Sequence, residues 1–267
     1  MKIITLLNEK GGVGKSTMAA LIASGLALLG HRVVIVDADA QGNVTSAFGL
    51  DKQPHFFMLC TLSPEELGKQ RVTRLVPPEH YAPENSTSAG DLHCISSDTS
   101  TRKLAPLIAN RQISKLILRE RLSVMNGWAD FVIIDTPPTP SDLHEAIAAA
   151  TDYVIMPTQC EAFSGLEGLP DTIGHTANIA KLAAESGINV SQLVAIIPNM
   201  FEKKSTVHQE ILPILQRNYG QLVWEEVPKT ETIRQSHLRQ RSLFALYPRV
   251  QVTKLMWTFV KRIEALA

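Results

Sequence analysis

Short apolar runs alternate along the chain with segments in which apolar residues recur every three or four positions. The first run, Ile3 to Asn8, leads into a glycine-rich stretch. Apolar residues then recur at helical spacing from Met18 to Leu29, where Gly30 ends the pattern. Further strands are expected at Val33–Asp37, Phe131–Asp135, Tyr153–Pro157, Leu193–Pro198 and Leu222–Val227, and further helices near 164–186, 205–218 and 250–266. This order predicts parallel strands joined by crossover helices, in a doubly wound, mostly parallel α/β sheet flanked by helices.

A carboxylate ends two of the expected strands, Asp37 on one and Asp135 on the other. In open α/β sheets, ligands bind outside the carboxyl ends of the strands. We therefore expect function at this edge.

Residues 51–105 form the least regular part of the sequence, because five prolines interrupt it and residues 84–90 are polar. No linker is long enough to separate two domains. We expect one domain over residues 1–267, with 51–105 as an irregular elaboration whose tip is mobile.

The composition, 45% hydrophobic and 19% charged residues over 267 positions, suits one large α/β core. The apolar run near Met1 is too short for a signal peptide, and no stretch approaches the ~20 apolar residues of a membrane helix. A soluble, cytoplasmic protein is expected. Cys60, Cys94 and Cys160 lie far apart without a C-x-x-C pair, so neither a zinc ribbon nor a disulfide framework is indicated.

The candidate chemistry lies in the segment Lys10-Gly11-Gly12-Val13-Gly14-Lys15-Ser16-Thr17, between an expected strand and an expected helix. Its glycines allow successive backbone N–H groups to converge on one point, where the helix N-terminus adds partial positive charge. This pattern predicts a nucleotide-phosphate site formed by residues 10–17. Lys15 would reach the β- and γ-phosphates, Ser16 would offer its hydroxyl to Mg²⁺, and Thr17 would bond the α-phosphate.

The usual P-loop has glycine where this chain has Glu9, and the match is to the deviant form with a second lysine, Lys10. The loop resembles the signature of the ParA/MinD family of P-loop ATPases, and the closest resemblance is to the Soj-like ParA partition proteins. The similarity continues through nearly the whole chain and is weakest across 51–130. The further matching segments are Asp39-Ala40-Gln41-Gly42-Asn43, Asp135-Thr136-Pro137-Pro138, Gln159-Cys160-Glu161 and Gly165-Leu166-Glu167-Gly168.

The resemblance implies ATP and Mg²⁺ as cofactors and a homodimer with two sandwiched nucleotides. Lys10 would cross to the partner subunit's phosphates, so that hydrolysis depends on dimerisation. Asp39 would orient or activate the attacking water and would belong, with Ser16 and Asp135, to the residues of the metal site. Asp135 would hold Mg²⁺ through a water molecule. Asn199, just after an expected strand, would read the adenine edge, since an amide supplies both a donor and an acceptor.

Structural interpretations of the same residues remain open: short acids such as Asp37 and Asp39 also cap turns, and Asn199 also suits a turn. For Asp37 we expect a supporting role within the strand end. The sequence departs from the family pattern at Ala40, where proline is usual, and at Ala146, where partition members often carry asparagine. Neither departure touches the phosphate or magnesium chemistry.

Charge is unevenly distributed, because residues 1–197 carry 15 Lys+Arg and 20 Asp+Glu, whereas residues 198–267 carry 11 and 6. This basic C-terminal part predicts contact with an anionic partner, for which non-specific DNA is the first choice. The candidate contacts are Lys203, Lys204, Arg234, Arg239 and Arg241, and a family arginine aligns one residue away from Arg234.

The resemblance thus implies a slow, partner-stimulated ATPase that coats nucleoid DNA and is reset by a ParB-like adaptor. One alternative is MinD-like membrane attachment through the apolar stripe from Val252 to Leu266, but such a stripe is more often the inner face of a packed helix. Stable membrane association is therefore not expected. A second alternative is a reductase or metal-handling role like that of nitrogenase iron proteins, which would need cysteines placed to bridge a cluster at the dimer interface. The remaining alternative is a structural role with an inactive nucleotide site.

Overall fold

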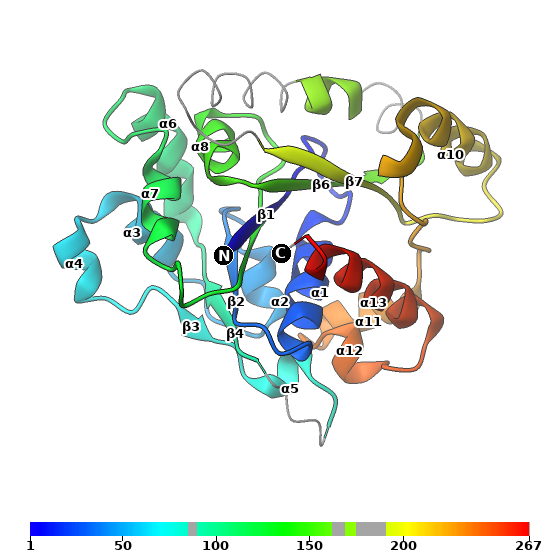
Figure 1. Cartoon of the computed structure of the whole chain (residues 1–267), viewed down its shortest axis with the longest axis horizontal. Helices are drawn as coiled ribbons and strands as arrows, with labels where there is room; N and C mark the ends of the chain where they lie inside the picture. The colour runs from blue at the N-terminus through cyan, green and yellow to red at the C-terminus, as the bar shows by residue number, and fades with distance from the viewer. Residues whose placement is uncertain (85–89, 162–168, 175–190, 267) are drawn as a thin grey trace.

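A twisted parallel β-sheet with helices on both faces forms the centre of the molecule (Figure 1). The computed structural model describes residues 1–84, 90–161, 169–174 and 191–266. Within these residues the sheet has seven strands in the order β3-β4-β2-β5-β1-β6-β7, all parallel except for the pair β3 and β4. The strands are β1 (Lys2–Leu6), β2 (Val33–Asp37), β3 (Arg74–Leu75), β4 (Leu92–Ile95), β5 (Phe131–Asp135), β6 (Tyr153–Gln159) and β7 (Gln192–Asn199).

The helices divide between the two faces of the sheet, which is the doubly wound arrangement predicted from the sequence. One face is covered by α1 (Lys15–Leu28), α2 (Asn43–Ala47), α12 (Leu243–Leu246) and α13 (Gln251–Glu264). The other face is covered by α3 (His55–Thr61), α6 (Leu104–Ala109), α7 (Ile117–Ser123) and α8 (Asp142–Ala150). The remaining elements are α4 (Pro64–Gly68), α5 (Pro78–Tyr81), α10 (Thr206–Tyr219), α11 (Glu231–Leu238) and the 3₁₀ turns Thr99–Lys103 and Gly220–Leu222.

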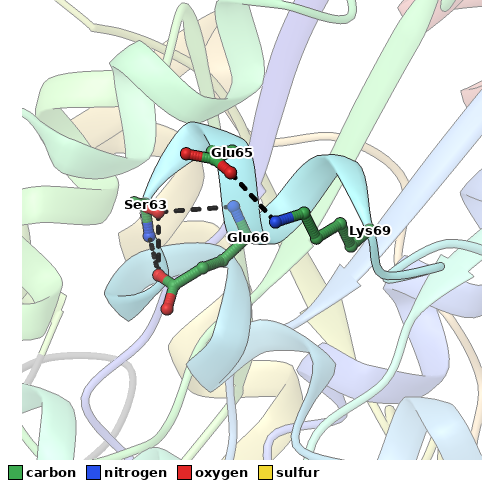
Figure 2. A network of polar contacts seen from close by, with 4 residues as sticks. All are labelled: Ser63, Glu65, Glu66 and Lys69. Atoms are coloured by element: carbon green, nitrogen blue, oxygen red, sulfur yellow. Dashed lines mark hydrogen bonds and ion pairs between the residues drawn. The ribbon is translucent and has the colours of Figure 1, made fainter.

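The segment expected to be an irregular elaboration, 51–105, contributes more to the sheet than the sequence indicated. Within it, β4 pairs in parallel with β2, and Leu92, Cys94 and Ile95 are buried. The short helix α4 begins with a capping box, in which Glu66 N–H donates to the Ser63 hydroxyl and Ser63 N–H donates to the Glu66 carboxylate (Figure 2). Lys69 pairs with Glu65 one turn away. The polar stretch at 85–89 lies outside the described residues.

The prediction of a strand at Leu222–Val227 is wrong. Its first residue ends a 3₁₀ turn, and Val223 makes only an isolated bridge to Ile196. The chain runs beside β7 with intermittent hydrogen bonds, from Trp224 N–H to Ile196 O and from Val227 N–H to Pro198 O. The charged pair Glu225 and Glu226 and the following proline, which lacks an N–H, do not favour a continuous ladder. Of the helix expected near 164–186, residues 169–174 are described and helical, and the rest lies outside the described residues.

The C-terminal helix α13 packs on α1 as a core element. Met256, Phe259, Val260 and Ile263 are fully buried, and Val252 is nearly so. Gly25 of α1 allows this close approach, because an added Cβ would meet Val260 Cγ2 at 2.4 Å. The apolar stripe of α13 therefore faces the core, as the sequence analysis favoured over membrane attachment. Among the described helices, none has both the length and the apolar character needed to cross a bilayer.

We expect His93, on the β3–β4 edge, to make the stability of the fold sensitive to acid. Its ring packs edge-to-face on Trp128, with 4.9 Å between the ring centroids. Its Nδ1 is buried and has no hydrogen-bond partner among the described residues. Burial lowers the pKa of His93, against the opposing effect of Asp91. In the unfolded chain, where a histidine has a pKa of about 6.5, the ring binds a proton more readily than in the folded chain.

We therefore expect the full contribution of His93 to stability above pH about 6.5 and its progressive loss at lower pH. The His93→Phe variant keeps a ring against Trp128 but cannot titrate. Thermal unfolding followed by circular dichroism should show a smaller fall in melting temperature between pH 7.5 and 5.5 for His93→Phe than for the wild type. An identical fall in both proteins would exclude His93 as a source of the acid sensitivity.

Candidate phosphate-binding site

The carboxyl ends of three adjacent strands, β1, β2 and β5, bring the predicted site residues together. The parallel register pairs Asp37 with Asp135 and Leu6 with Asp135. The loop 10–17 leaves the sheet beside them and leads into α1. The carboxylates at this edge and the loop therefore form one site, as the strand-end pattern predicted.

The loop presents an open helix N-terminus. Gly12 and Gly14 have φ values of 78° and 94°, which only glycine adopts without strain. No side chain caps the N-terminus of α1, and its first turn carries no acidic residue. The unfilled amide donors at this end of α1 make an anion site of the kind that phosphate occupies.

Lys15 lies inside this site. Its side chain is 7% exposed, and Nζ donates to Asn8 O at 2.8 Å and to Lys10 O at 3.2 Å. Burial lowers the pKa of Lys15, while Asp135 and Asp39 act to raise it. The ammonium is held within the loop by backbone carbonyls, so it needs little rearrangement to meet a phosphate.

Asp135 has an unsatisfied buried carboxylate. The residue is fully buried, and neither carboxylate oxygen has a hydrogen-bond partner among the described residues. Burial and the neighbouring Asp37 raise its pKa well above the usual range, whereas Ser16 and Lys15 act to lower it. Orphaned buried groups of this kind are rare in folded proteins. A carboxylate and a hydroxyl side by side form the oxygen donor set that Mg²⁺ prefers, so the residues present fit that ion.

Asp37 and Asp39 have different surroundings. Asp37 Oδ2 accepts hydrogen bonds from Thr45 N–H at 2.8 Å and Thr45 Oγ1 at 2.7 Å, which ties the strand end to α2. Burial raises its pKa to about 6, against these hydrogen bonds. Asp39 Oδ1 accepts a hydrogen bond from Gln41 N–H at 2.9 Å, and its charge reaches Lys15. Asp37 thus has the supporting contacts expected of it, and Asp39 faces the loop.

Asn199 contacts the loop from the end of β7. Its Nδ2 donates to Val13 O at 2.8 Å, and the residue is 6% exposed. Together with Gly14, Thr17 and Pro228, it lines a cavity of about 150 Å³ that opens beside the start of α1. The adenine contact expected of Asn199 stays a prediction.

Lys10 pairs within its own chain. Its Nζ lies 2.9 Å from Glu161 Oε2, and both side chains are partly exposed. Asn8 was missed by the sequence analysis, although its side chain joins the loop to β6 by donating to Pro157 O and accepting from Lys10 N–H. An asparagine at the end of an apolar run, directly before the glycines, was the available signal. The segment Gly165–Gly168 lies outside the described residues.

The two departures from the family pattern have ordinary surroundings. Ala146 of α8 is fully buried in the core beneath α3, α6, α7 and α8, where an apolar side chain fits. Ala40 is half-buried between Asp39 and Gln41. The three cysteines are buried free thiols, and the described residues contain no cluster of three or more histidine, cysteine or acidic side chains suited to a metal.

The predicted DNA residues differ in their exposure and in their partners. Lys203 and Lys204 are exposed just before α10, and Arg239 is exposed at the end of α11. Arg234 is exposed but pairs with Glu231 at 3.3 Å. Arg241 is half-buried, and its Nε donates to Glu79 O at 2.7 Å, which ties it to α5. Arg241 is thus engaged in the fold, and the other four are open to solvent.

The comparisons with known proteins show the family to which the chain belongs. A family model described as an AAA domain matches residues 1–190. The chromosome-partitioning ATPase Soj of Thermus thermophilus is 31% identical over 228 residues, which cover 85% of this chain and 80% of that protein.

Two solved structures share the fold. A Cyanothece McdA variant in complex with ATP matches with a TM-score of 0.75 at 20% identity, over 99% of this chain and 96% of that one. The septum site-determining protein MinD of Pyrococcus horikoshii, complexed with Mg-ADP, matches with a TM-score of 0.71 at 18% identity over the same shares. The chain belongs to the ParA/MinD family of P-loop ATPases.

Proposed function

We propose that this protein is a positioning ATPase that binds Mg·ATP at the loop 10–17 and hydrolyses it slowly. The observation that carries the proposal is the uncapped N-terminus of α1, with buried Lys15 and the unsatisfied carboxylate of Asp135 beside it. The amides and Lys15 supply positive potential to the phosphates. The nucleotide-bound McdA and MinD relatives support the same cofactors.

The residues divide the chemistry among them. The amides of 11–17 and Lys15 bind the phosphates, and Ser16 and Asp135 would hold Mg²⁺, which neutralises phosphate charge when bound. Asp39 lies where its carboxylate can orient water, since its charge reaches Lys15 in the same site. Asn199 and the cavity beside α1 receive the base.

Dimerisation completes the site through Lys10. In the single chain Lys10 pairs with Glu161, and both groups are partly exposed, so the ammonium is free to exchange this partner for phosphates of a second subunit. Hydrolysis then depends on the dimer, as it does when an arginine finger is supplied in trans.

The Lys10→Ala variant tests this dependence. We expect it to bind ATP as a monomer, to lose the ATP-dependent dimer in size-exclusion light scattering, and to lose about tenfold or more of its ATPase rate. Lys69→Ala, a change of the same residue type at the exposed C-cap position directly after α4, should leave both unchanged. Intact dimerisation and hydrolysis in Lys10→Ala would show that the lysine has no role across subunits.

The dimer is proposed to bind DNA without sequence preference, which would place it on the nucleoid in the cytoplasm. Exposed Lys203, Lys204, Arg234 and Arg239 are the candidate phosphate contacts. Each such contact contributes about 0.9 to the slope of log affinity against log salt concentration.

We expect Arg239→Ala to weaken ATP-dependent retention on random duplex DNA and to reduce the salt slope by about 0.9, whereas Lys69→Ala leaves the slope unaltered. Fluorescence anisotropy across a salt series measures both quantities. Retention on anionic vesicles instead of DNA would favour the MinD-like alternative.

A ParB-like adaptor is proposed to stimulate hydrolysis and so release the dimer from DNA. The Soj relative, whose name is that of a chromosome-partitioning ATPase, supports DNA as the cargo. An ATPase rate that rises when an adaptor encoded beside this gene is added, and only with DNA present, is the expected result.

A further inference from the structure

The segment that follows β5 has few backbone donors of its own. It reads Asp135-Thr136-Pro137-Pro138-Thr139-Pro140, and its three prolines lack an N–H. After Thr136, only Thr139 carries a backbone amide that could donate a hydrogen bond. The position of this segment therefore depends on donors elsewhere in the chain that reach its carbonyl oxygens.

Two hydrogen bonds fix the start of the segment to the sheet. Ala38 N–H donates to Asp135 O at 3.0 Å, and Thr136 Oγ1 donates to Leu6 O at 2.8 Å. These bonds join the carboxyl ends of β1, β2 and β5. They end at Thr136, so the next carbonyl, that of Pro137, needs a partner outside the sheet.

His144 supplies the donor for that carbonyl. The residue lies in the first turn of α8, is 3% exposed, and its Nε2 lies 2.9 Å from Pro137 O. A carbonyl oxygen only accepts hydrogen bonds, so the proton of this bond is on Nε2. On the other side of the ring, Nδ1 lies 3.3 Å from the hydroxyl oxygen of Ser141. The neutral ring with its proton on Nε2 satisfies both contacts, since Nδ1 then accepts from that hydroxyl.

The helix that carries His144 is packed firmly on the sheet. Leu143, Ala146 and Ile147 of α8 are buried in the same core cluster as Val132 and Ile134 of β5. A hydrogen bond in buried surroundings is also stronger than an exposed one, because it acts at a lower dielectric. The bond to Pro137 therefore transmits the fixed position of α8 to the segment after β5.

This position matters for Asp135, whose carboxylate has no hydrogen-bond partner among the described residues. Its direction is then set mainly by the backbone on either side of it. We propose that His144 is a positioning residue of the magnesium site, which restrains the backbone after Asp135 through Pro137 O. The inference rests on the proposed binding of Mg·ATP. Groups that orient the residues around a metal typically contribute about 10–100-fold to metal affinity.

Two amide variants separate the two contacts of the ring. In His144→Gln the amide nitrogen can take the place of Nε2 and donate to Pro137 O, whereas the shorter amide of His144→Asn reaches only the Nδ1 position beside Ser141. Glu145→Gln is the control on the same turn of α8, because it removes an ion pair with Lys115 and leaves the ring of His144 in place. Thermal unfolding confirms that each variant is folded.

The measurement is the affinity of the full chain for a non-hydrolysable ATP analogue, by isothermal titration calorimetry in Mg²⁺ and in EDTA. We expect the gain in affinity that Mg²⁺ provides to fall about tenfold in His144→Asn, to stay within about threefold of the wild type in His144→Gln, and to be unchanged in Glu145→Gln. The affinity in EDTA should be equal in all four chains, because the amides of 11–17 and Lys15 are unaltered. Nitrogen-15 NMR of the nucleotide-free wild type should show the Nε2–H tautomer for His144.

Equal losses in His144→Asn and His144→Gln, an equal loss with and without Mg²⁺, or an Nδ1–H tautomer would overturn the positioning role. A wild-type chain that gains affinity from Mg²⁺, together with a His144→Asn variant that gains as much, overturns the role of His144 alone. A wild-type chain that gains nothing from Mg²⁺ contradicts the proposed metal site, and the role of His144 falls with it.

Discussion

The Asp135→Asn variant should be more stable than the wild type and almost inactive. Its carboxylate is fully buried beside Asp37 without a hydrogen-bond partner among the described residues, and its raised pKa reflects the cost of that charge. An amide of the same shape removes the charge. Without Mg²⁺, we expect a gain on the order of 1–2 kcal/mol and a melting temperature a few degrees higher.

Activity should move in the opposite direction. If Asp135 binds Mg²⁺ through a water molecule, an amide in its place binds that water more weakly. The loss of such an outer-sphere partner typically lowers metal affinity or activity about 10–100-fold. The ATPase rate at saturating Mg²⁺ and differential scanning calorimetry in EDTA measure the two effects. Asp130→Asn, at the opposite end of the same strand, is the matched control. A variant that is less stable or fully active would show that Asp135 has a structural role.

The second large effect is expected at Gly14. A Cβ added there would meet Asn199 Nδ2 at 2.2 Å, and the residue has a φ of 94°. Gly14→Ala therefore incurs the left-handed backbone strain of about 1–2 kcal/mol and also displaces Asn199 from Val13. We expect a loss of about 2–4 kcal/mol in unfolding free energy and at least a tenfold weaker affinity for ATP.

Gly12 provides the matched control within the same loop. It has a φ of 78°, but an added Cβ meets nothing within 4 Å. Gly12→Ala should lose only the backbone strain, about 1–2 kcal/mol. Adding Asn199→Ala to Gly14→Ala should recover part of the stability, since it removes the clash. Chemical denaturation that shows equal losses for the two glycines, or no recovery in the double variant, would contradict the role of Asn199 as the packing partner of the loop.

The sequence was sufficient to predict the elements that position the site. The runs that precede Asp37 and Asp135 are apolar throughout, as is typical of buried parallel strands. The two carboxylates lie side by side because the parallel register aligns the strand ends. The glycines of the loop 10–17 predicted a phosphate site, and the structure gives Gly12 and Gly14 the positive φ values that few other residues adopt. β4 was missed because the prolines around it dominate the local pattern.

Other features depend on contacts between residues distant in the sequence. Asn8 bonds Pro157 across 149 residues and Lys10 pairs with Glu161 across 151, and no local pattern marks either pair. The expected strand at 222–227 failed because its apolar residues suggested a ladder, whereas the charged pair within it and Pro228 permit only isolated bridges.

The central claim is that the loop 10–17 binds the phosphates of ATP with magnesium. Isothermal titration calorimetry of Mg·ATP into the folded wild-type chain tests it most directly, with Lys15→Ala as the comparison. We expect one saturable site per chain in the wild type and at least about a hundredfold weaker binding in Lys15→Ala. A folded wild-type chain that gives no saturable heat, or equal binding by Lys15→Ala, would contradict it.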